Sequence, residues 1–185
     1  MQMNFQKHTY WIVGVTPLLT HNPASMQVGS SSPSRKKTIP TPEQEAEAGL
    51  YKIEGGFGIP AVAFRSALIY GCRGFKMGKV GAASVVAAAV THVDEFCLLL
   101  DPDTCKPLKK YEIDSRRCVI GNASIIRSRP KFPKWACKLI FEIDVDQINP
   151  SVVLTHLNEG GMKAGVGAYR PQKMGWFGKF TAKEI

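Results

Sequence analysis

The chain has 185 residues, the length of one domain, and its hydrophobic content of 44% is ordinary for a globular protein and too high for a disordered one. The net charge of +9 favours polyanionic partners, namely nucleic acid, an anionic membrane surface or an acidic protein. The first ten residues lack the apolar segment of a signal peptide, and no apolar stretch is long enough to span a bilayer. We therefore expect a cytoplasmic protein with no membrane partner.

A basic cluster occupies the middle of the chain. Between Lys106 and Lys138, ten basic residues stand against two acidic ones, Glu112 and Asp114, which gives this stretch a net charge of +8. One interpretation is a solvated basic face that keeps the protein soluble. The concentration of charge in one segment favours the other interpretation, a binding patch for a polyanion.

Five cysteines are present, an odd number without CxxC spacing, and most lie in or beside apolar runs. This pattern predicts buried, reduced thiols of a cytosolic protein and disfavours disulfides or a metal site. The cysteines are Cys72, Cys97, Cys105, Cys118 and Cys137.

The N-terminal part predicts a buried strand, a long insertion and a short helix. Apolar, β-branched residues from Tyr10 to Leu19 indicate the strand. The stretch from His21 to Pro40 is rich in serine, glycine and proline, which predicts a protruding basic loop that is either functional or disordered. Thr41 and Gln44 form a capping-box signature for a helix that ends before Gly49.

The next elements alternate between strand and helix. After a brief strand over Tyr51 to Ile53, a second helix is predicted from Pro60 to Cys72. Phe75 to Gly81 is a basic loop punctuated by glycine. Alanine content favours helix for Ala82 to Val90, and Val93 to Leu100 predicts a strand.

A β-hairpin and a long strand follow. Gly121-Asn122 between two short apolar segments is a hairpin turn signal, which makes Lys106 to Lys134 a basic hairpin extension. Trp135 to Val145 alternates apolar and polar residues, as a strand with one buried face does.

The last part of the chain completes a β–α–β unit. A helix is predicted from Pro150 to about Asn158, with Gly160-Gly161 as its C-terminal cap, and Trp176 to Ala182 predicts the closing strand. Residues 1–185 are thus predicted to form a single α+β domain. Its sheet is antiparallel and RRM-like or ferredoxin-like, with helices on one face, a long loop insertion and a β-hairpin extension.

Signatures of catalysis are missing from the sequence. It has no phosphate-binding GxxxxGK[ST] loop, no GxSxG motif and no zinc spacing among its histidines, which we expect to be ordinary surface or partly buried residues. Gly165-Val166-Gly167 lacks the third glycine of a dinucleotide fingerprint and follows a helix instead of a strand. We therefore predict no enzyme activity, no cofactor and no metal. The histidines are His8, His21, His92 and His156.

Glycines, cations and aromatic residues alternate near the C-terminus. Glycines let a main chain approach a ligand and expose its N–H groups, while cations and rings hold phosphates and bases. The alternative is a tight glycine turn whose aromatic residues fill the core, and we expect Phe180 and one of Trp176 or Phe177 to be core residues. The glycines are Gly165, Gly167, Gly175 and Gly178.

The candidate nucleic-acid-binding residues come from the long loop, the second helix, the hairpin and the C-terminal segment. Each supplies a positive charge or a ring for a sugar-phosphate strand. They are Arg35, Lys36, Lys37, Arg65, Arg116, Arg117, Arg127, Arg129, Lys131, Lys163, Tyr169, Arg170, Lys173, Trp176 and Lys179.

Two stretches resemble a known superfamily. The segment from Gly165 to Phe180, which starts Gly-Val-Gly and ends Gly-Trp-Phe-Gly-Lys-Phe, resembles the glycine-rich loop of the RAMP superfamily, RRM-like proteins that include the Cas7-like backbone subunits of CRISPR effectors. Ile59 to Leu68 is similar to the helix after the first strand in those proteins. The resemblance implies subunits that stack side by side along a single strand, with His21 to Pro40 as a loop reaching over the neighbour. Nuclease members carry a catalytic histidine beside this loop, and we expect none here.

The wider pattern resembles a group of bacteriophage proteins. The shared features are the opening Thr16 to His21, the segment Leu50 to Pro60, and Tyr169-Arg170-Pro171 with the closing Gly178 to Phe180. We predict a non-enzymatic, sequence-tolerant binder of single-stranded DNA or RNA that forms a homo-oligomer or filament in the cytoplasm, the host's if phage-encoded. It would serve replication, recombination or an RNA-guided complex. The alternative is a protein–protein interaction module that docks on or mimics a host CRISPR-type subunit.

Overall fold

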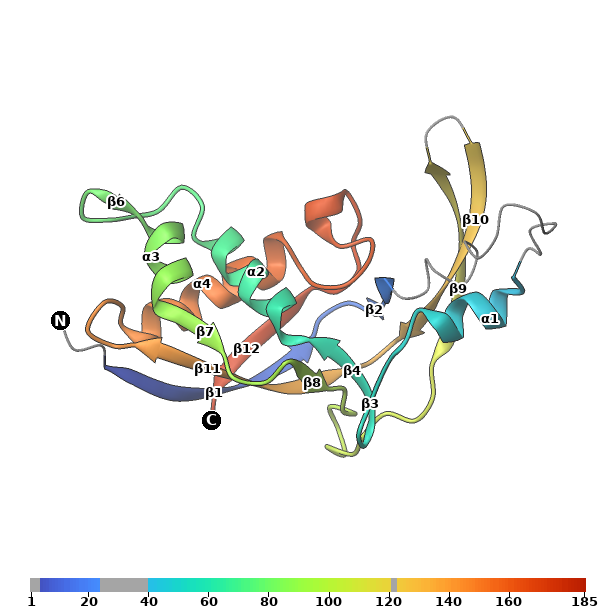
Figure 1. Ribbon diagram of the computed structural model, residues 1–185, viewed down its shortest axis with the longest axis horizontal. Helices are drawn as coiled ribbons and strands as arrows, with labels where there is room; N and C mark the ends of the chain where they lie inside the picture. Colours follow the sequence, from blue (N-terminus) through green and yellow to red (C-terminus); the bar gives the residue numbers. More distant parts are fainter. Residues whose placement is uncertain (1–3, 24–39, 121–122) are drawn as a thin grey trace, which may run out of the picture.

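The computed structural model describes residues 4–23, 40–120 and 123–185 (Figure 1). The helices are α1 (Pro42–Ala48), α2 (Ala61–Gly71), α3 (Ala82–Ala89), α4 (Pro150–Lys163) and the 3-10 helix η2 (Pro171–Lys173). The strands are β1 (Phe5–Gly14), β2 (Leu18–Leu19), β3 (Tyr51–Ile53), β4 (Gly56–Pro60), β5 (Lys76–Met77), β6 (Val80–Gly81), β7 (Val90–His92), β8 (Phe96–Leu98), β9 (Glu112–Ile120), β10 (Ala123–Phe132), β11 (Ala136–Asp144) and β12 (Phe180–Glu184).

The main sheet has the strand order β12-β1-β11-β7, and every neighbouring pair is antiparallel. β1 and β7 are therefore parallel with β11 between them, and β11 and β12 are parallel with β1 between them. Helices α2 and α3 lie in the first of these connections and α4 in the second, and all three cover the same face of the sheet (Figure 1). This double split β–α–β arrangement is the ferredoxin-like topology, so the predicted α+β fold is confirmed.

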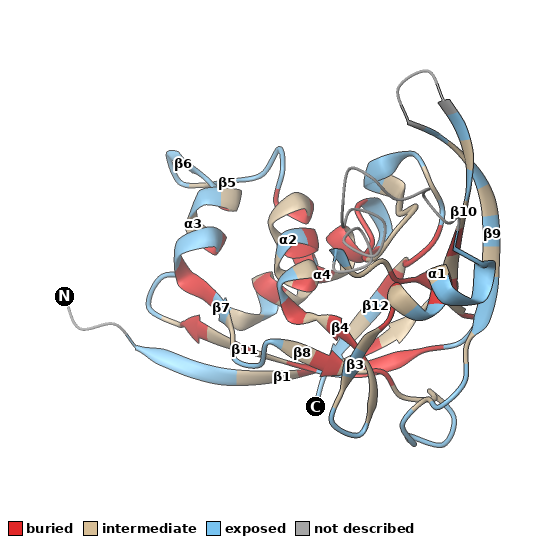
Figure 2. Cartoon of the chain, turned by 45° about the vertical axis from the view of Figure 1, so that its right-hand side comes forward, coloured by how far each residue is buried: buried red, intermediate tan, exposed pale blue. Residues whose placement is uncertain are grey.

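The core lies between this sheet and its helices (Figure 2). The alternation predicted for Trp135 to Val145 is confirmed, because Cys137, Leu139, Phe141 and Ile143 are all fully buried. Lys138 projects from the opposite, uncovered face. Burial of one face in this way fixes the strand register, since a shift by one residue would expose the whole apolar set.

The glycine pair in α4 has a different role from the predicted one. The helix does not end before Gly160-Gly161 but continues to Lys163. A Cβ atom at Gly160 would lie 2.0 Å from the carbonyl oxygen of Ala67 in α2, and one at Gly161 would lie 2.3 Å from that of Phe180 in β12. The two glycines therefore let α4 pack backbone to backbone against its neighbours, which a sequence pattern for a helix cap does not reveal.

Other predicted elements are confirmed with shifted ends. Thr41 and Gln44 form a complete capping box at α1, as predicted. The closing strand starts at Phe180 instead of Trp176, since Gly178, with φ of +68°, still belongs to the preceding turn. Of the cysteines, three are buried, Cys118 is half-buried and Cys105 is exposed, and all are free thiols. None of the helices within the described residues is both long and apolar enough to cross a membrane.

Candidate nucleic-acid interface

The hairpin of β9 and β10 projects from one end of the molecule (Figure 1). Its strands pair from Ala123↔Ile120 to Lys131↔Glu112, which confirms the predicted hairpin, while the turn at Gly121-Asn122 lies outside the described residues. At its base, β10 also pairs with β2. The hairpin packs against α1 and also against the glycine-rich loop, which we define as residues 164–179.

Helix α1 is bonded to strand β10 of the hairpin. The carboxylate of Glu45 accepts hydrogen bonds of 2.8 Å from Nη1 of Arg127 and from the backbone N–H of Ser128. Ser128, nearly fully buried, also bonds Ser115 across the hairpin at 2.8 Å. The charge of Arg127 is thus already balanced within the protein.

The hairpin joins the glycine-rich loop through arginine and ring contacts. The guanidinium of Arg116 lies 4.6 Å from the ring centroid of Phe177, and that of Arg129 lies 5.0 Å from the ring of Tyr169. The Tyr169 hydroxyl is 2.9 Å from Sγ of Cys118. We call these five residues the junction, since they connect the mid-chain basic segment to the C-terminal segment.

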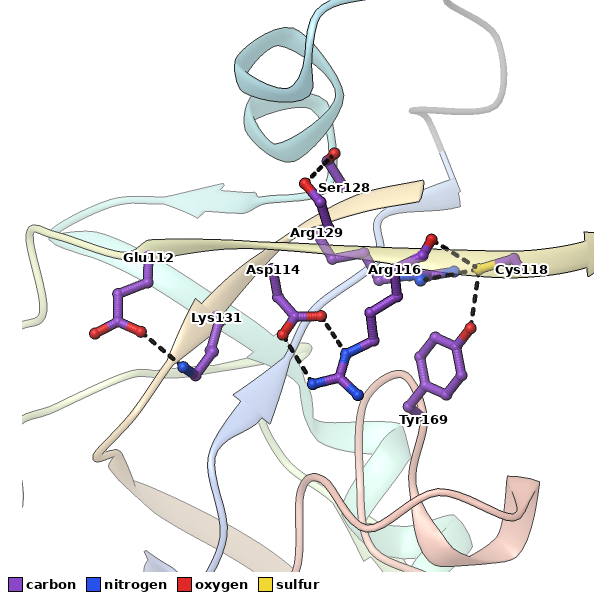
Figure 3. Close-up of polar contacts among 9 residues, drawn as sticks. Glu112, Asp114, Arg116, Cys118, Ser128, Arg129, Lys131 and Tyr169 are labelled. Carbon is purple, nitrogen blue, oxygen red and sulfur yellow. Dashed lines mark hydrogen bonds and ion pairs between the residues drawn. The ribbon is translucent and has the colours of Figure 1, made fainter. Parts of the chain in front are cut away.

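Electrostatics at the junction favour a fixed geometry. Asp114 binds Arg116 with both carboxylate oxygens, and this hydrogen bonding raises the pKa of the guanidinium (Figure 3). The hydrogen bond to Cys118, followed by burial, raises the pKa of Tyr169, so its hydroxyl stays protonated at neutral pH. Each cation–ring contact adds roughly 0.5–2 kcal/mol, depending on its exposure to water.

The glycine-rich loop folds on itself. We predicted that its glycines expose N–H groups to a ligand, and this is wrong for three of the four, because Gly165, Gly175 and Gly178 each donate to a backbone carbonyl of the protein. A Cβ atom at Gly175 would lie 1.7 Å from the carbonyl oxygen of Tyr169, so this glycine permits an internal approach. The alternative of a tight turn describes the backbone correctly.

The side chains of this loop nevertheless face outward. Lys173 is exposed, and Trp176 is 50% exposed with its ring 4.4 Å from that of Phe177, which is buried together with Phe180 as expected. Arg170 donates to the Gly167 carbonyl at 3.0 Å, and no carboxylate pairs with it, with Lys173 or with Lys179 in the described part of the chain. The loop therefore presents three unneutralised cations and a ring.

A groove of about 300 Å³ lies next to the loop. It is bounded by the start of α2, by Gly167 and Arg170, and by His21 and Tyr51. The Tyr51 hydroxyl donates to the His21 carbonyl at 3.1 Å. Burial, with the nearby charges of Arg129 and Arg127, lowers the pKa of His21, so its imidazole is uncharged at neutral pH.

His21 overturns one expectation. We expected no candidate for a catalytic histidine beside the glycine-rich loop, but the chain after β2 brings His21 into the same groove as Gly167 and Arg170. These residues are about 150 positions apart in the sequence, so no local motif connects them. The signal that was available is the position of His21 directly after an apolar strand, where loop residues line sites.

The remaining predicted site residues are distributed differently. Arg65 donates to the carbonyls of Val90 and Ala87, which fastens α2 to the end of α3, and it does not line the groove. Lys131 pairs with Glu112 and Lys163 with Glu159, whereas Arg117 is exposed and bonds only Ser124 among the described residues. Arg35, Lys36 and Lys37 lie outside the described residues.

No group of three or more His, Cys, Asp or Glu side chains able to hold a metal ion occurs within residues 4–23, 40–120 and 123–185. No protein-family model matches the sequence, and no curated protein matches it either. Among solved structures, the chain is similar to Cas6 in a product complex, with a TM-score of 0.33 and 12% identity. It is also similar to Cmr6 from Pyrococcus furiosus, with a TM-score of 0.48 and 10% identity.

These alignments cover 98% of the chain in both cases, 53% of the Cas6 chain and 100% of the Cmr6 chain. The chain thus spans about half the length of the Cas6 chain that it matches. At this level of similarity, no site residue is carried over from either protein.

Proposed function

We propose that this protein binds single-stranded DNA or RNA, with little dependence on base sequence and without catalysing a reaction. The observation that carries this proposal is the junction, where ring contacts hold the basic hairpin against the glycine-rich loop. Beside it stand Arg170 and Lys173, which no carboxylate neutralises within the described residues, and the half-exposed ring of Trp176.

Cations without partners are the ones that bind phosphates most favourably, because no internal ion pair has to be broken. Each phosphate that they neutralise releases counterions, which gives affinity without sequence information. A half-exposed tryptophan offers a stacking surface to any base, since every base has a π-face. The combination favours a single strand, whose unstacked bases are accessible, over a duplex.

We also propose that copies of the chain assemble side by side along the strand. The register of the hairpin places Val119 and Ile126 on one of its faces, 68% and 71% exposed, and such apolar side chains on a projecting element mark a contact with another protein. The resemblance to bacteriophage proteins and to the RAMP superfamily supports a role in phage replication, recombination or an RNA-guided complex, in the cytoplasm of a host.

Fluorescence anisotropy with labelled single-stranded DNA and RNA tests binding. We expect the wild type to bind at low salt, and Arg170→Ala with Lys173→Ala to weaken binding on the order of tenfold while the melting temperature stays unchanged. The matched control is Lys138→Ala with Lys183→Ala, which removes the same charge from the uncovered face of the sheet and retains affinity. If neither nucleic acid binds the wild type at low salt, the proposal is rejected.

The apolar pair on the hairpin also favours the alternative function, a protein–protein interaction module. Replacement of Val119 and Ile126 by serine separates the two functions. For a nucleic-acid binder, the variant keeps its affinity for a short oligonucleotide and no longer forms the larger complexes that sedimentation detects on a long one. A wild type that self-associates without binding any oligonucleotide supports the alternative instead.

A further inference from the structure

A second basic surface lies far from the junction in the sequence. From Gly55 to Val93 the chain contains no aspartate or glutamate. Within this stretch, residues 73–81 carry Arg73, Lys76 and Lys79 and fold into a small two-stranded ribbon, β5 paired with β6. We call residues 73–81 the basic ribbon.

The basic ribbon is anchored at its base. Phe75 donates its N–H to the Cys72 carbonyl at 3.2 Å and accepts a 3.0 Å hydrogen bond from Ala82. Its ring lies 4.8 Å from the ring of the buried His156, although 48% of the side chain is exposed. The ribbon is therefore a folded part of the surface, continuous with α2 and α3.

No other part of the protein packs closely against the two glycines in the turns of the ribbon. Gly74 and Gly78 have φ angles of +86° and +62°, a conformation that glycine adopts without strain. A Cβ atom at either position would meet no other atom within 4 Å, whereas one at Gly175 in the glycine-rich loop would collide with the protein. These two glycines thus shape the turns and leave the backbone accessible to a ligand.

The charges of the ribbon are not neutralised internally. Lys76 and Lys79 are exposed and form no ion pair in the described part of the chain, and Arg73 lies 4.4 Å above the ring of Tyr70. On the hairpin, by contrast, Arg116 and Arg127 are paired with carboxylates. For its size, the ribbon therefore has more charge available to a polyanion than the hairpin has.

The ribbon and the hairpin rise on the same side of the molecule. Figures 1 and 2 both show them at opposite ends, each extending on the side of the main sheet that carries the helices, with η2 and the glycine-rich loop between them. A strand held at the loop and followed away from the hairpin therefore runs over the helices toward the ribbon.

We infer that the basic ribbon is a second contact for the sugar-phosphate backbone of the same single strand. This inference rests on the proposed function and extends its binding site across the helical side of the molecule. Lys76 and Lys79 hold phosphates, and the open turns at Gly74 and Gly78 let the strand approach. An anionic membrane is less favoured as the partner, because the ring of Phe75 is packed against that of His156.

Oligonucleotide length tests the inference. Anisotropy is measured with single strands of about 8 and about 24 nucleotides, since binding modules of this size class cover roughly 4–16 nucleotides. Lys76→Ala with Lys79→Ala is expected to weaken binding of the long strand on the order of tenfold, and to reduce its salt slope by about 1.4, or about 0.7 for each phosphate that is no longer neutralised. Affinity for the short strand, which the loop alone holds, stays unchanged.

The control is again Lys138→Ala with Lys183→Ala. If the wild type binds neither strand, the proposed function itself fails. If the wild type binds both and the two double variants bind the long strand equally well, only the ribbon inference is overturned. It is also overturned if the ribbon variant keeps full affinity for the long strand but no longer binds vesicles of phosphatidylserine and phosphatidylcholine, because the ribbon is then a membrane contact.

Discussion

The salt dependence of binding follows from which cations are already paired. Along the hairpin, the glycine-rich loop and the basic ribbon, some cations face carboxylates and others make neither an ion pair nor a ring contact within the described residues. The second group consists of Lys76, Lys79, Arg117, Arg170, Lys173 and Lys179. For these residues, binding a phosphate does not require an internal ion pair to be broken.

The magnitude follows directly from this group. With a slope of about −0.7 per neutralised phosphate on a single strand, roughly six such phosphates give a slope of about −4 for log affinity against log salt. Between about 50 mM and about 200 mM salt, affinity for a long single strand then falls about 300-fold. Anisotropy titrations at several salt concentrations measure the slope.

Two results would refute this reasoning. A slope shallower than about −1 means that these cations do not contact phosphates. A slope steeper than about −6 means that Arg116, Arg127 and Lys131 leave their carboxylates on binding, since roughly three further phosphates add about −2. In that case internal pairing does not determine which cations are available.

The adjacent rings of Trp176 and Phe177 are expected to serve binding and stability, respectively. Trp176→Ala is expected to lower affinity by about 1–3 kcal/mol with an unchanged melting temperature. Phe177→Ala is expected to lower the free energy of unfolding by about 3–5 kcal/mol. Equal losses of stability in both variants contradict this. Gly160→Ala places a methyl group against the Ala67 carbonyl and is expected to destabilise the fold by about 2 kcal/mol, which lowers the melting temperature by about 6 °C. Calorimetry measures this change. A melting temperature that does not decrease counts against the close contact between α2 and α4. Because the pKa of His21 in the folded protein lies below 6.5, the unfolded chain binds more protons, so stability falls as the pH drops below about 6.5. His21→Gln is expected to flatten this part of the plot of melting temperature against pH. An unchanged plot argues against a lowered pKa of His21 in the folded protein.

Much of the fold was predictable because its signals are local. The capping box at Thr41, the alternation after Trp135 and the hairpin around Gly121-Asn122 each depend on a few consecutive residues, and each corresponds to an element of the structure. The extent of α4 was not predictable in this way. Gly160 and Gly161 stop many helices, but here their lack of a side chain is used for contacts with α2 and β12, which are distant in sequence.

For the candidate site, the sequence indicated which segments carry charge and rings, but not how they are arranged in space. Charge and ring content pointed to the hairpin and the C-terminal segment, and the structure brings these two together at the junction. The sequence did not reveal which arginines are neutralised, since Arg127 meets Glu45 only through the fold. It also did not reveal that His21 shares a groove with Arg170, because that groove forms between segments at the two ends of the chain.

The crossing of α2 and α4 fixes the distance between the two proposed contacts for a strand. A Cβ atom at Gly71 in α2 would lie 2.2 Å from the carbonyl oxygen of His156 in α4, so at this point the two helices touch through their main chains. The basic ribbon follows α2, which ends at Gly71, and the glycine-rich loop follows α4, which ends at Lys163. The spacing between the two proposed contacts is therefore set by backbone atoms, and a strand that reaches both would have to follow the path of the protein.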